Sequence, residues 1–405
     1  MMERIAITAN GPGEIAGWVR PLLTRLFEAQ PALEVHLFLV PDDYATGREA
    51  QTVAGWFPQV HVYEGKATLR ALLGAGGGVP AKMDFVQYLG GDLMHAARLA
   101  RRSGAAAATY KFSRPAYREL FVRAFAIDLR NVEELAKARV HRDRIVLTGN
   151  LAIDGALMEA ELPAPSTAPR DGILILPGSR RYEVEQGIPF FFTVAAAIKR
   201  VRSDVEIAFG ISPFTPMEDV RQAIAGGGHP RVYAMPGRFM VEGGQAYLTD
   251  RAETVRFAVL RNALPAAKQA RMVITMPGTK TIELAALGKA MLAVTPLNVA
   301  EMLAINGPLT YLNRLPVIGE RLKRAVVVAA ARRFTYFTQP NMDAGRALIA
   351  ELRGTLTPGR VATVALERFD DRAWLEDSAQ ALRSLYVEHA GAARRMARGI
   401  LECAA

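Results

Sequence analysis

The sequence predicts an α/β protein with two Rossmann-like domains, because one pattern occurs twice and a proline-rich segment separates the copies. In the first copy, the apolar run Ile5–Thr8 breaks into Asn10-Gly11-Pro12-Gly13-Glu14 ahead of a helical stretch. In the second, Ile173–Leu176 breaks into Pro177-Gly178-Ser179-Arg180 ahead of another. Each copy is typical of a strand, a tight loop and a helix N-terminus, where backbone N–H groups and the helix dipole favour an anion. We therefore expect a ligand in a cleft between the two domains.

The composition is that of a globular protein, since 50% of the 405 residues are hydrophobic and 22% are charged. The single cysteine, Cys403, excludes an internal disulfide framework and a cysteine-based zinc site, and it fits a reducing compartment. The N-terminus has no basic region followed by a long apolar core, and no apolar run reaches the roughly 18 residues of a spanning helix. These features predict a cytoplasmic protein.

The net charge of +10 needs an anionic partner or a solvated basic surface as its explanation. Nucleic acid, an anionic membrane surface and a phosphorylated substrate are the three partner classes. The sequence carries no RNP pattern, zinc-finger spacing or basic-zipper heptad, so no nucleic-acid partner is expected.

The N-terminal domain is expected over residues 1–165, with strands that alternate with helical stretches such as Gly17–Ala29 and Leu93–Ser103. Such alternation predicts a parallel sheet covered by helices. Its strand candidates are Ile5–Thr8, Val35–Val40, Val60–Tyr63, Phe85–Tyr88 and Ala106–Tyr110.

The C-terminal domain is expected over residues 170–360, after the linker Pro163–Pro169, whose three prolines cannot sustain a helix or a central strand. A hairpin is predicted over Phe239–Thr249, around Gly243-Gly244. Residues 361–405 have helical spacing and should pack back across the domain boundary. The strand candidates of this domain are Ile173–Leu176, Val205–Phe209, Val232–Met235, Met272–Thr275 and Met291–Thr295.

The loop that follows Leu176 carries residues suited to phosphate. Gly178 permits close backbone approach, Ser179 can bond phosphate or cap the helix, and Arg180 offers a fork of donors. The alternative is an ordinary strand-to-helix turn with a serine cap.

A second loop, Met276-Pro277-Gly278-Thr279, also follows an apolar strand and leads to Glu283 within a helix. Gly278 and Thr279 would place a backbone donor and a hydroxyl at a helix N-terminus, and the Glu283 carboxylate can accept two ribose hydroxyls. The alternative is a capping arrangement. Asn341, in Gln339-Pro340-Asn341, either caps the next helix or donates to a diphosphate. Together these residues predict a nucleotide-sugar site.

Taken in order, these motifs resemble the lipid-A-disaccharide synthase family. The resemblance rests on Leu176–Arg180 with Glu183, on Gly278-Thr279 with Glu283, and on Pro340-Asn341 followed by Ala344-Gly345-Arg346. Gly149-Asn150 with Asp154 resembles a further motif of the family, and Gly13–Gly17 resembles its N-terminal loop, with Glu14 where aspartate is usual.

The resemblance implies a GT-B fold, with two Rossmann-like domains that face a cleft. It also implies an inverting hexosyltransferase that moves a GlcNAc-type sugar from a UDP-sugar to a lipid-linked or phosphorylated sugar, without a metal or another cofactor. Arg180, Asn341 and Gly278 would then attend the diphosphate, and Glu283 the ribose. A homodimer is also suggested.

Such a transfer needs a general base, which should come from the N-terminal domain. Asp92, in Gly90-Gly91-Asp92 after the strand Phe85–Tyr88, is the first candidate, and Glu14 is the second. The alternative for Asp92 is a helix N-cap. The loop residues Asn10, Gly11 and Gly13 would face the acceptor.

Two basic segments predict contact with an anionic membrane, and hence a peripheral position on the inner face of the cell membrane. Residues 98–123 interleave arginines with Tyr110, Phe112, Tyr117 and Phe121, and residues 311–333 repeat the theme. The alternative is a buried helix with a solvated basic face.

Two other functions compete with glycosyl transfer. A UDP-sugar epimerase of the same architecture would need no lipid acceptor and no basic and aromatic surface. A non-catalytic membrane-associated relative would bind anionic vesicles but not UDP.

Overall fold

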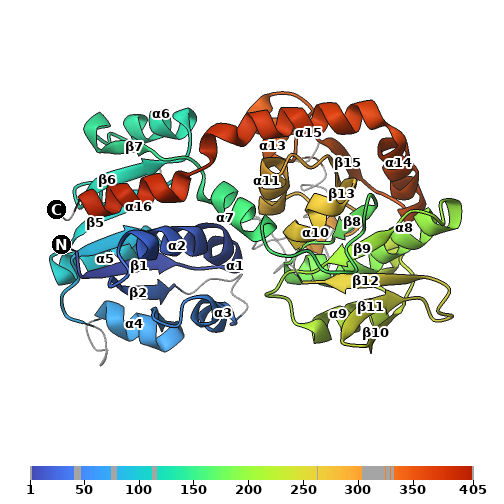
Figure 1. Ribbon diagram of the computed structural model, residues 1–405, viewed down its shortest axis with the longest axis horizontal. Coiled ribbons are helices and arrows are strands. Elements are labelled where there is room, and N and C mark those ends of the chain that lie inside the picture. The colour runs from blue at the N-terminus through green and yellow to red at the C-terminus, as the bar shows by residue number, and fades with distance from the viewer. Residues whose placement is uncertain are drawn as a thin grey trace. The chain divides into compact units, whose positions relative to one another are not determined.

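The computed structural model describes residues 2–40, 47–73, 80–111, 116–261, 263–302 and 333–403, together with Arg324 and Ala329. The chain divides into two compact units (Figure 1), one formed by Met1–Met158 with Tyr386–Ala405 and one formed by Glu159–Leu385. Both units are α/β, and the chain ends in helices, so the expected fold class is confirmed. The proline-rich segment 163–169 lies in the second unit, as do residues 361–385, whereas residues 386–405 return to the first.

The first unit is built on a parallel sheet that has seven strands among the described residues, in the order β3-β2-β1-β4-β5-β6-β7. The chain runs from β1 outward through β2 to β3, then crosses back to lay β4 on the other side of β1. The strands are β1 Arg4–Ala9, β2 Glu34–Leu39, β3 His61–Tyr63, β4 Phe85–Tyr88, β5 Ala106–Tyr110, β6 Phe121–Ala126 and β7 Ile145–Leu147.

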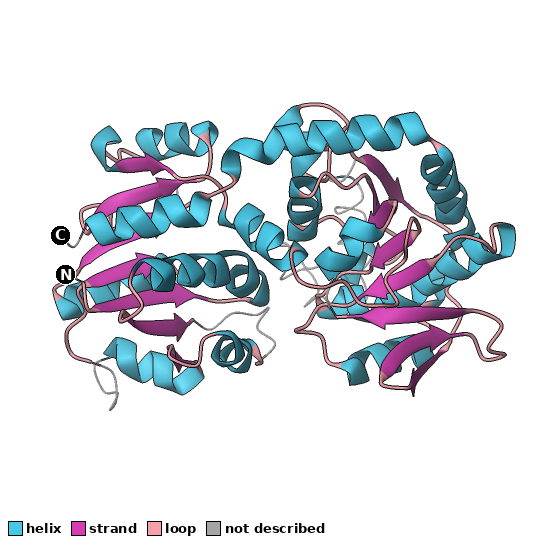
Figure 2. Cartoon of the chain, in the orientation of Figure 1, coloured by secondary structure: helices cyan, strands magenta, loops and turns pink. Residues whose placement is uncertain are grey.

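Helices connect these strands and pack against the sheet (Figure 2). The entrance to α2 is a π-helix, η1, and the short helices η2 and η7 are of the 3-10 type. The helices are α1 Pro12–Glu14, η1 Ile15–Val19, α2 Arg20–Ala29, α3 Glu49–Trp56, α4 Gly65–Leu73, α5 Leu93–Ser103, α6 Leu129–Lys137, η2 Arg142–Arg144, α7 Leu151–Ala160, η7 Val387–His389 and α16 Ala392–Glu402.

The second unit has a sheet with eight strands among the described residues, in the order β10-β11-β12-β9-β8-β13-β14-β15. The pairs β10 with β11 and β11 with β12 are antiparallel, and the other neighbours are parallel. The strands are β8 Ile173–Leu176, β9 Ile207–Gly210, β10 Arg238–Glu242, β11 Gln245–Thr249, β12 Arg256–Leu260, β13 Met272–Thr275, β14 Met291–Pro296 and β15 Ala350–Gly354.

The apolar core of the second unit gathers β8, β9, β13 and β14 with α8 and α14. The phenylalanines at positions 190–192 in α8 are all buried, which anchors this helix against the sheet. The helices are η3 Glu183–Gly187, α8 Ile188–Val201, α9 Met217–Gly226, η4 Pro230–Val232, α10 Ala263–Gln269, α11 Thr279–Ala286, η5 Ala300–Met302, α13 Gln339–Ala344, α14 Pro358–Asp370 and α15 Arg372–Tyr386, of which η3 is a π-helix.

Most predicted strands are confirmed, including the hairpin at Gly243-Gly244, which joins β10 to β11. The strand predicted over Val232–Met235 is wrong. Pro230 starts a 3-10 turn there, and Tyr233 adopts a φ of 55°, a left-handed conformation that no strand allows. The strands β6, β7, β12 and β15 were not predicted.

The Gly149-Asn150 motif has a structural role in the first unit. The Asn150 side chain accepts the N–H of Ala152 at 3.1 Å and so caps α7. The Asp154 carboxylate accepts the N–H groups of Gly391 and Ala393, each at 2.7 Å. These donors lie at the N-terminus of α16, where a carboxylate is favourable. The motif therefore holds the returning C-terminal helix in the first unit.

Candidate functional site at the switch point of the second sheet

The second sheet changes direction between β8 and β13. From β8 the chain builds outward through β9, then returns to place β13 on the other side of β8. In such sheets ligands bind beyond the carboxyl ends of the strands at this switch point. The N–H of Met276 donates to the carbonyl of Leu176 at 3.4 Å, so the loops that leave the two strands start side by side. These are the two loops whose motifs predict a nucleotide.

The loop after β8 is capped by its own glutamate. Oε2 of Glu183 accepts the backbone N–H of Ser179 at 2.8 Å and that of Arg180 at 3.0 Å. Gly178 has a φ of 103°, and a Cβ at this position would overlap the Glu183 carboxylate. Glycine is therefore required both by the left-handed backbone and by the close approach of the carboxylate.

This cap changes what the loop offers to an anion. A carboxylate already occupies the two N–H groups that were expected to bind phosphate, and its negative charge opposes a phosphate there. The guanidinium of Arg180 lies 3.3 Å from Oε1 of Glu183, with 59% of its side chain exposed. Arg180 therefore presents its side chain at the loop surface, whereas its backbone N–H points inward to Glu183.

The loop after β13 has a different N-terminus. Gly278 is the N-cap of α11 and, as a glycine, provides no side chain to cap this helix. Gly278 and Thr279 are exposed, and Gly278 has an extended backbone at φ 161°. The carbonyl of Gly278 accepts the hydroxyl of Thr281 at 2.7 Å, which fixes the first turn. The helix therefore presents its first N–H groups toward solvent, where the helix dipole favours an anion.

Glu283 lies one turn inside α11 and is 8% exposed. Oε2 of its carboxylate forms a hydrogen bond and an ion pair with Nζ of Lys280. The pairing holds the carboxylate in one orientation and balances its charge. The alternative of a capping arrangement has no support at Glu283, because its carboxylate pairs with the Lys280 side chain.

Asn341 is fully buried and has a structural role. Its side-chain oxygen accepts the N–H groups of Leu348 and Ile349, and its amide nitrogen donates to Ile349 and Glu351. These bonds use all four hydrogen-bonding positions of the amide. They join α13 to the segment that leads into β15. Asn341 lies inside α13, which ends at Ala344, so it does not cap a helix that begins near Ala344, as one alternative expected, and its amide has no donor left for a diphosphate.

The first unit repeats the self-capped loop at its own switch point, between β1 and β4. Oε2 of Glu14 accepts the N–H of Asn10 at 3.0 Å, and a Cβ at Gly90 would overlap the Glu14 carboxylate. Asn10 in turn accepts the N–H of Gly11 at 2.7 Å. Gly13 is exposed, with open space around it.

The likeness between the two units extends into the following helix. Glu14 directly precedes η1 and Glu183 begins η3, and in both units a proline, Pro21 or Pro189, is the second residue of the α-helix that follows. A proline inside a helix has no N–H to donate and crowds the carbonyl four residues earlier. The wider π turn accommodates this, and π turns are frequent at functional sites.

Asp92 is the N-cap of α5, where its side chain accepts the N–H of Met94 at 2.9 Å. The side chain is exposed at the carboxyl end of β4, so the cap does not bury the carboxylate. His95, one turn along, has its pKa lowered because it is partly buried, although the Asp92 charge acts in the opposite direction. Among the described residues, Nδ1 of His95 has no hydrogen-bond partner.

Two of the aromatic residues expected on a basic surface over residues 98–123 lie in the core instead. Tyr110 and Phe121 are buried at 1% and 5% exposure, and the Tyr110 hydroxyl accepts the N–H of Leu151. Tyr117 packs under the guanidinium of Arg101, which also pairs with Glu119. Phe112 and nearly all of residues 311–333 lie outside the described residues. Within the described part of the chain, none of the helices is both long and apolar enough to cross a membrane.

No protein-family model and no curated protein matches the sequence. Among solved structures, the chain is similar to UDP-GlcNAc 2-epimerase of Neisseria meningitidis bound to UDP-GlcNAc, with 12% identity, 99% of this chain and 100% of that chain covered, and a TM-score of 0.58. For MnaA of S. aureus with UDP the identity is 14%, the coverage 98% and 95%, and the TM-score 0.59. For UDP-N-acetylglucosamine 2-epimerase of Rickettsia bellii the values are 12%, 100% and 97%, and 0.53.

These similarities show the fold, and the expected GT-B class is confirmed by them. The resemblance to the lipid-A-disaccharide synthase family is wrong as a statement of family, because the similar structures are epimerases. The predictions of an inverting hexosyltransferase and of a role in lipid A synthesis rested on this resemblance, and they are wrong as well. A lipid acceptor and an anionic membrane surface have no support. That the protein needs no metal and forms a homodimer stays a prediction.

The self-capped loop predicts a specific stability effect. Gly178→Ala should lower the free energy of unfolding by about 1–3 kcal/mol, because alanine is strained at this backbone conformation and displaces the Glu183 carboxylate. Urea denaturation followed by circular dichroism measures this. Gly226→Ala is the matched control, since nothing lies within 4 Å of a Cβ at that glycine of the same unit. Equal stability of the two variants would contradict the role of Gly178.

Proposed function

We propose that this chain is a UDP-sugar epimerase that acts on UDP-N-acetylglucosamine or a related UDP-hexose. The observation that carries the proposal is the switch point of the second sheet, where an uncapped helix N-terminus, an exposed arginine and a buried glutamate follow neighbouring strands. Similar structures that contain UDP or UDP-GlcNAc support it. A UDP-sugar is also the anionic partner that the net charge of +10 calls for.

The diphosphate would bind at the N-terminus of α11, to the first N–H groups of the helix and the Thr279 hydroxyl. This N-terminus has no side-chain cap, whereas the N–H groups of the Ser179 loop are already bonded to Glu183. The guanidinium of Arg180 would supply charge-assisted hydrogen bonds from the neighbouring loop. Gly178, Ser179 and Glu183 would then act indirectly, by fixing the loop that carries Arg180.

The ribose would bind to Glu283. Lys280 holds Oε2 of this carboxylate, and we assign the ribose hydroxyls to Oε1. A carboxylate whose orientation is fixed by an ion pair loses less freedom when it accepts a hydroxyl, which favours binding. Asn341 is left out of the proposed site, because its amide is fully bonded within the protein.

Epimerisation inverts one carbon of the sugar. When that carbon is C2, a base takes its proton, the C–H electron pair forms a C1=C2 double bond and the C1–O bond to UDP breaks. UDP then bonds to C1 again while C2 takes a proton from an acid or from solvent on the opposite face. The carboxylates at the switch point of the first unit are the proposed acid–base groups. Asp92 is the first choice because its side chain is exposed, and Glu14 is second because its carboxylate is already bonded to the Asn10 loop.

The reaction predicts its own isotope signature. The protein incubated with UDP-N-acetylglucosamine in D₂O, without lipid, should form the C2 epimer with deuterium at C2, because the removed proton is replaced from solvent. Proton NMR and mass spectrometry measure both products. Asp92→Asn should lower the rate by about 10²–10⁴-fold, the usual contribution of an acid–base group.

The control for this assay is Asp143→Asn, which changes an exposed carboxylate beside His141 and should leave the rate unchanged. Absence of the epimer and of deuterium with all UDP-hexoses tested would contradict the proposed reaction. If the protein binds UDP but turns over none of these sugars, it is a UDP-binding protein and not an epimerase.

The ribose assignment predicts a linked loss of affinity. Glu283→Ala should weaken UDP binding by about 10- to 100-fold, the effect of losing a hydrogen bond to a charged group. The wild-type protein should also bind UDP more tightly than 2′-deoxy-UDP, and this preference should disappear in the variant. Isothermal titration calorimetry measures all four affinities.

Glu218→Ala, which removes an exposed carboxylate of α9 in the same unit, is the matched control and should bind UDP as the wild type does. If Glu283→Ala binds UDP as tightly as the control does, Glu283 does not contact the ribose.

A further inference from the structure

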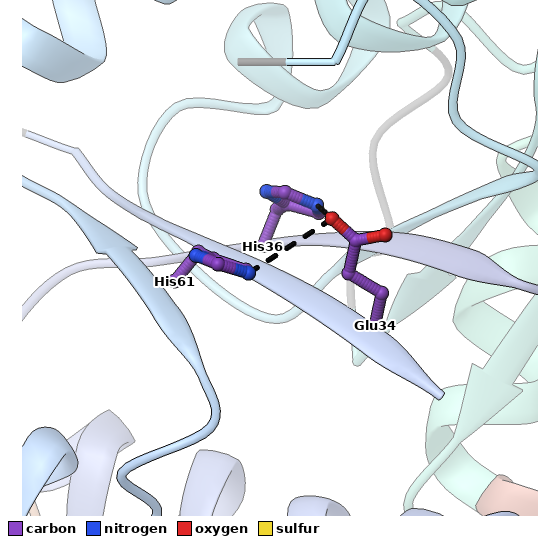
Figure 3. A group of neighbouring side chains, drawn as sticks. All are labelled: Glu34, His36 and His61. Carbon is purple, nitrogen blue, oxygen red and sulfur yellow. Dashed lines mark hydrogen bonds and ion pairs between the residues drawn. The ribbon is translucent and has the colours of Figure 1, made fainter. Parts of the chain in front are cut away.

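Two histidines and a glutamate gather on the strands β2 and β3 of the first unit (Figure 3). Glu34 and His36 are two residues apart on β2, so their side chains share one face of the sheet. His61 opens β3 and pairs in register with His36. The three residues thus lie at or near the amino ends of their strands. The switch-point loops of this unit follow the carboxyl ends of β1 and β4, so the histidine cluster is separate from them.

Their ligand atoms converge. Nε2 of His36 lies 2.9 Å from Oε1 of Glu34, and Nε2 of His61 lies 3.9 Å from the same oxygen. All three ligand atoms are within 4.8 Å of one another. Two ligands of a tetrahedral zinc ion, each about 2.0–2.1 Å from the metal, are roughly 3.3 Å apart. The two histidine–carboxylate distances are each within about 0.6 Å of this spacing, so rotation of the side chains, His61 above all, would bring the ligand atoms around one ion.

The residues behind this set hold it in the orientation that a metal needs. The Tyr63 hydroxyl lies 3.0 Å from Nδ1 of His36 and can accept the Nδ1–H, which leaves Nε2 for a metal. The guanidinium of Arg4 binds Oε2 of Glu34 at 2.8 Å and so directs Oε1 toward the histidines. Outer partners of this kind orient the ligands in metal sites.

The burial of the three residues differs in a way that suits metal entry. His36 is 1% exposed, whereas 56% of the His61 side chain is exposed. Burial lowers the pKa of His36, although Glu34 acts in the opposite direction. His61 therefore forms the open side of the set.

We propose that Glu34, His36 and His61 form a binding site for a divalent transition-metal ion of the zinc class. Two imidazole nitrogens and one carboxylate oxygen suit Zn²⁺, Ni²⁺ or Cu²⁺, whereas Mg²⁺ and Ca²⁺ prefer oxygen ligands. The positive charge of Arg4 offsets that of Glu34, which further favours metals that bond strongly to imidazole. A fourth position is left for water.

The ion would join β3, an edge strand of three residues, to its neighbour β2. A metal that binds only the folded protein stabilises it by mass action. Nε2 of His36 now lies against Oε1 of Glu34, so the metal would take the place of this contact. The role is structural, and it is independent of the proposed epimerase reaction.

The test uses the full chain, freed of metal with a chelator and titrated with Zn²⁺ alone. Calorimetry should detect one site per chain, and Zn²⁺ should raise the melting temperature. His61→Ala changes a mostly exposed side chain at the sheet edge, so the variant should fold, and it should bind Zn²⁺ at least 10-fold more weakly. His61→Cys, which restores a zinc ligand, should recover binding. His141→Ala is the matched control, since His141 is an exposed histidine beside a carboxylate in the same unit, and it should bind as the wild type does.

Two results would overturn the proposal: no Zn²⁺ binding by the wild type, or equal binding by His61→Ala and the wild type. In either case the three residues would form only a packed stack, in which the His36 ring lies on His61 with centroids 4.9 Å apart. Neither result affects the proposed UDP site, because UDP binding can be measured separately by calorimetry on the same protein samples.

Discussion

The architecture of the candidate site depends on a carboxylate that turns back onto its own loop. Glu183 fills the N–H groups of Ser179 and Arg180, which a strand-to-helix loop would otherwise present to an anion. Because these donors are satisfied internally, the loop keeps its shape without a ligand and presents the Arg180 side chain instead. The first unit uses Glu14 at Asn10 in the same way. At the neighbouring loop, Gly278, the N-cap of α11, makes no side-chain cap, and this is where we propose that the diphosphate binds.

The topology explains why these few residues come together. Each sheet reverses direction beside its first strand, so a loop from β8 meets one from β13, and a loop from β1 meets one from β4. Motifs about a hundred residues apart in the sequence therefore become neighbours, as the hydrogen bond between Met276 and Leu176 shows. The prolines that follow each glutamate, with their π-helical turns, give both units the same entrance to the helix.

The sequence predicted the fold well because buried parallel strands are continuous apolar runs. Phe85–Tyr88, Ala106–Tyr110 and Met272–Thr275 were found to the residue. Among the strands it missed, β15 alternates apolar and polar residues and is partly exposed along its length, so it has no apolar run to detect. The strands β7 and β12 do have short apolar runs, Ile145–Leu147 and Phe257–Leu260, and were overlooked. Val232–Met235 has such a run, but the turn that Pro230 begins outweighs it.

The function was predicted less well, because a local motif does not show which hydrogen bonds are already made. Two motifs suit a ligand site and a structural role equally well: Gly-Ser-Arg with Glu183, and Asn341 with its helix. In this structure Glu183 and Asn341 bond to the protein itself and stabilise the fold. The family resemblance rested on these same residues. Aromatic residues between arginines also predicted a membrane surface, but Tyr110 and Phe121 face the core, a distinction that spacing alone could not make.

The most direct measurement of the central claim is the response of backbone N–H groups to UDP, followed by NMR on the perdeuterated, ¹⁵N-labelled protein. The account predicts that the amide signals of Thr279 and Lys280 shift strongly on titration, while those of Ser179 and Arg180 change little because Glu183 still holds them. The opposite pattern, with Ser179 and Arg180 shifted and Thr279 unaffected, would show that phosphate displaces the carboxylate, and it would contradict the account.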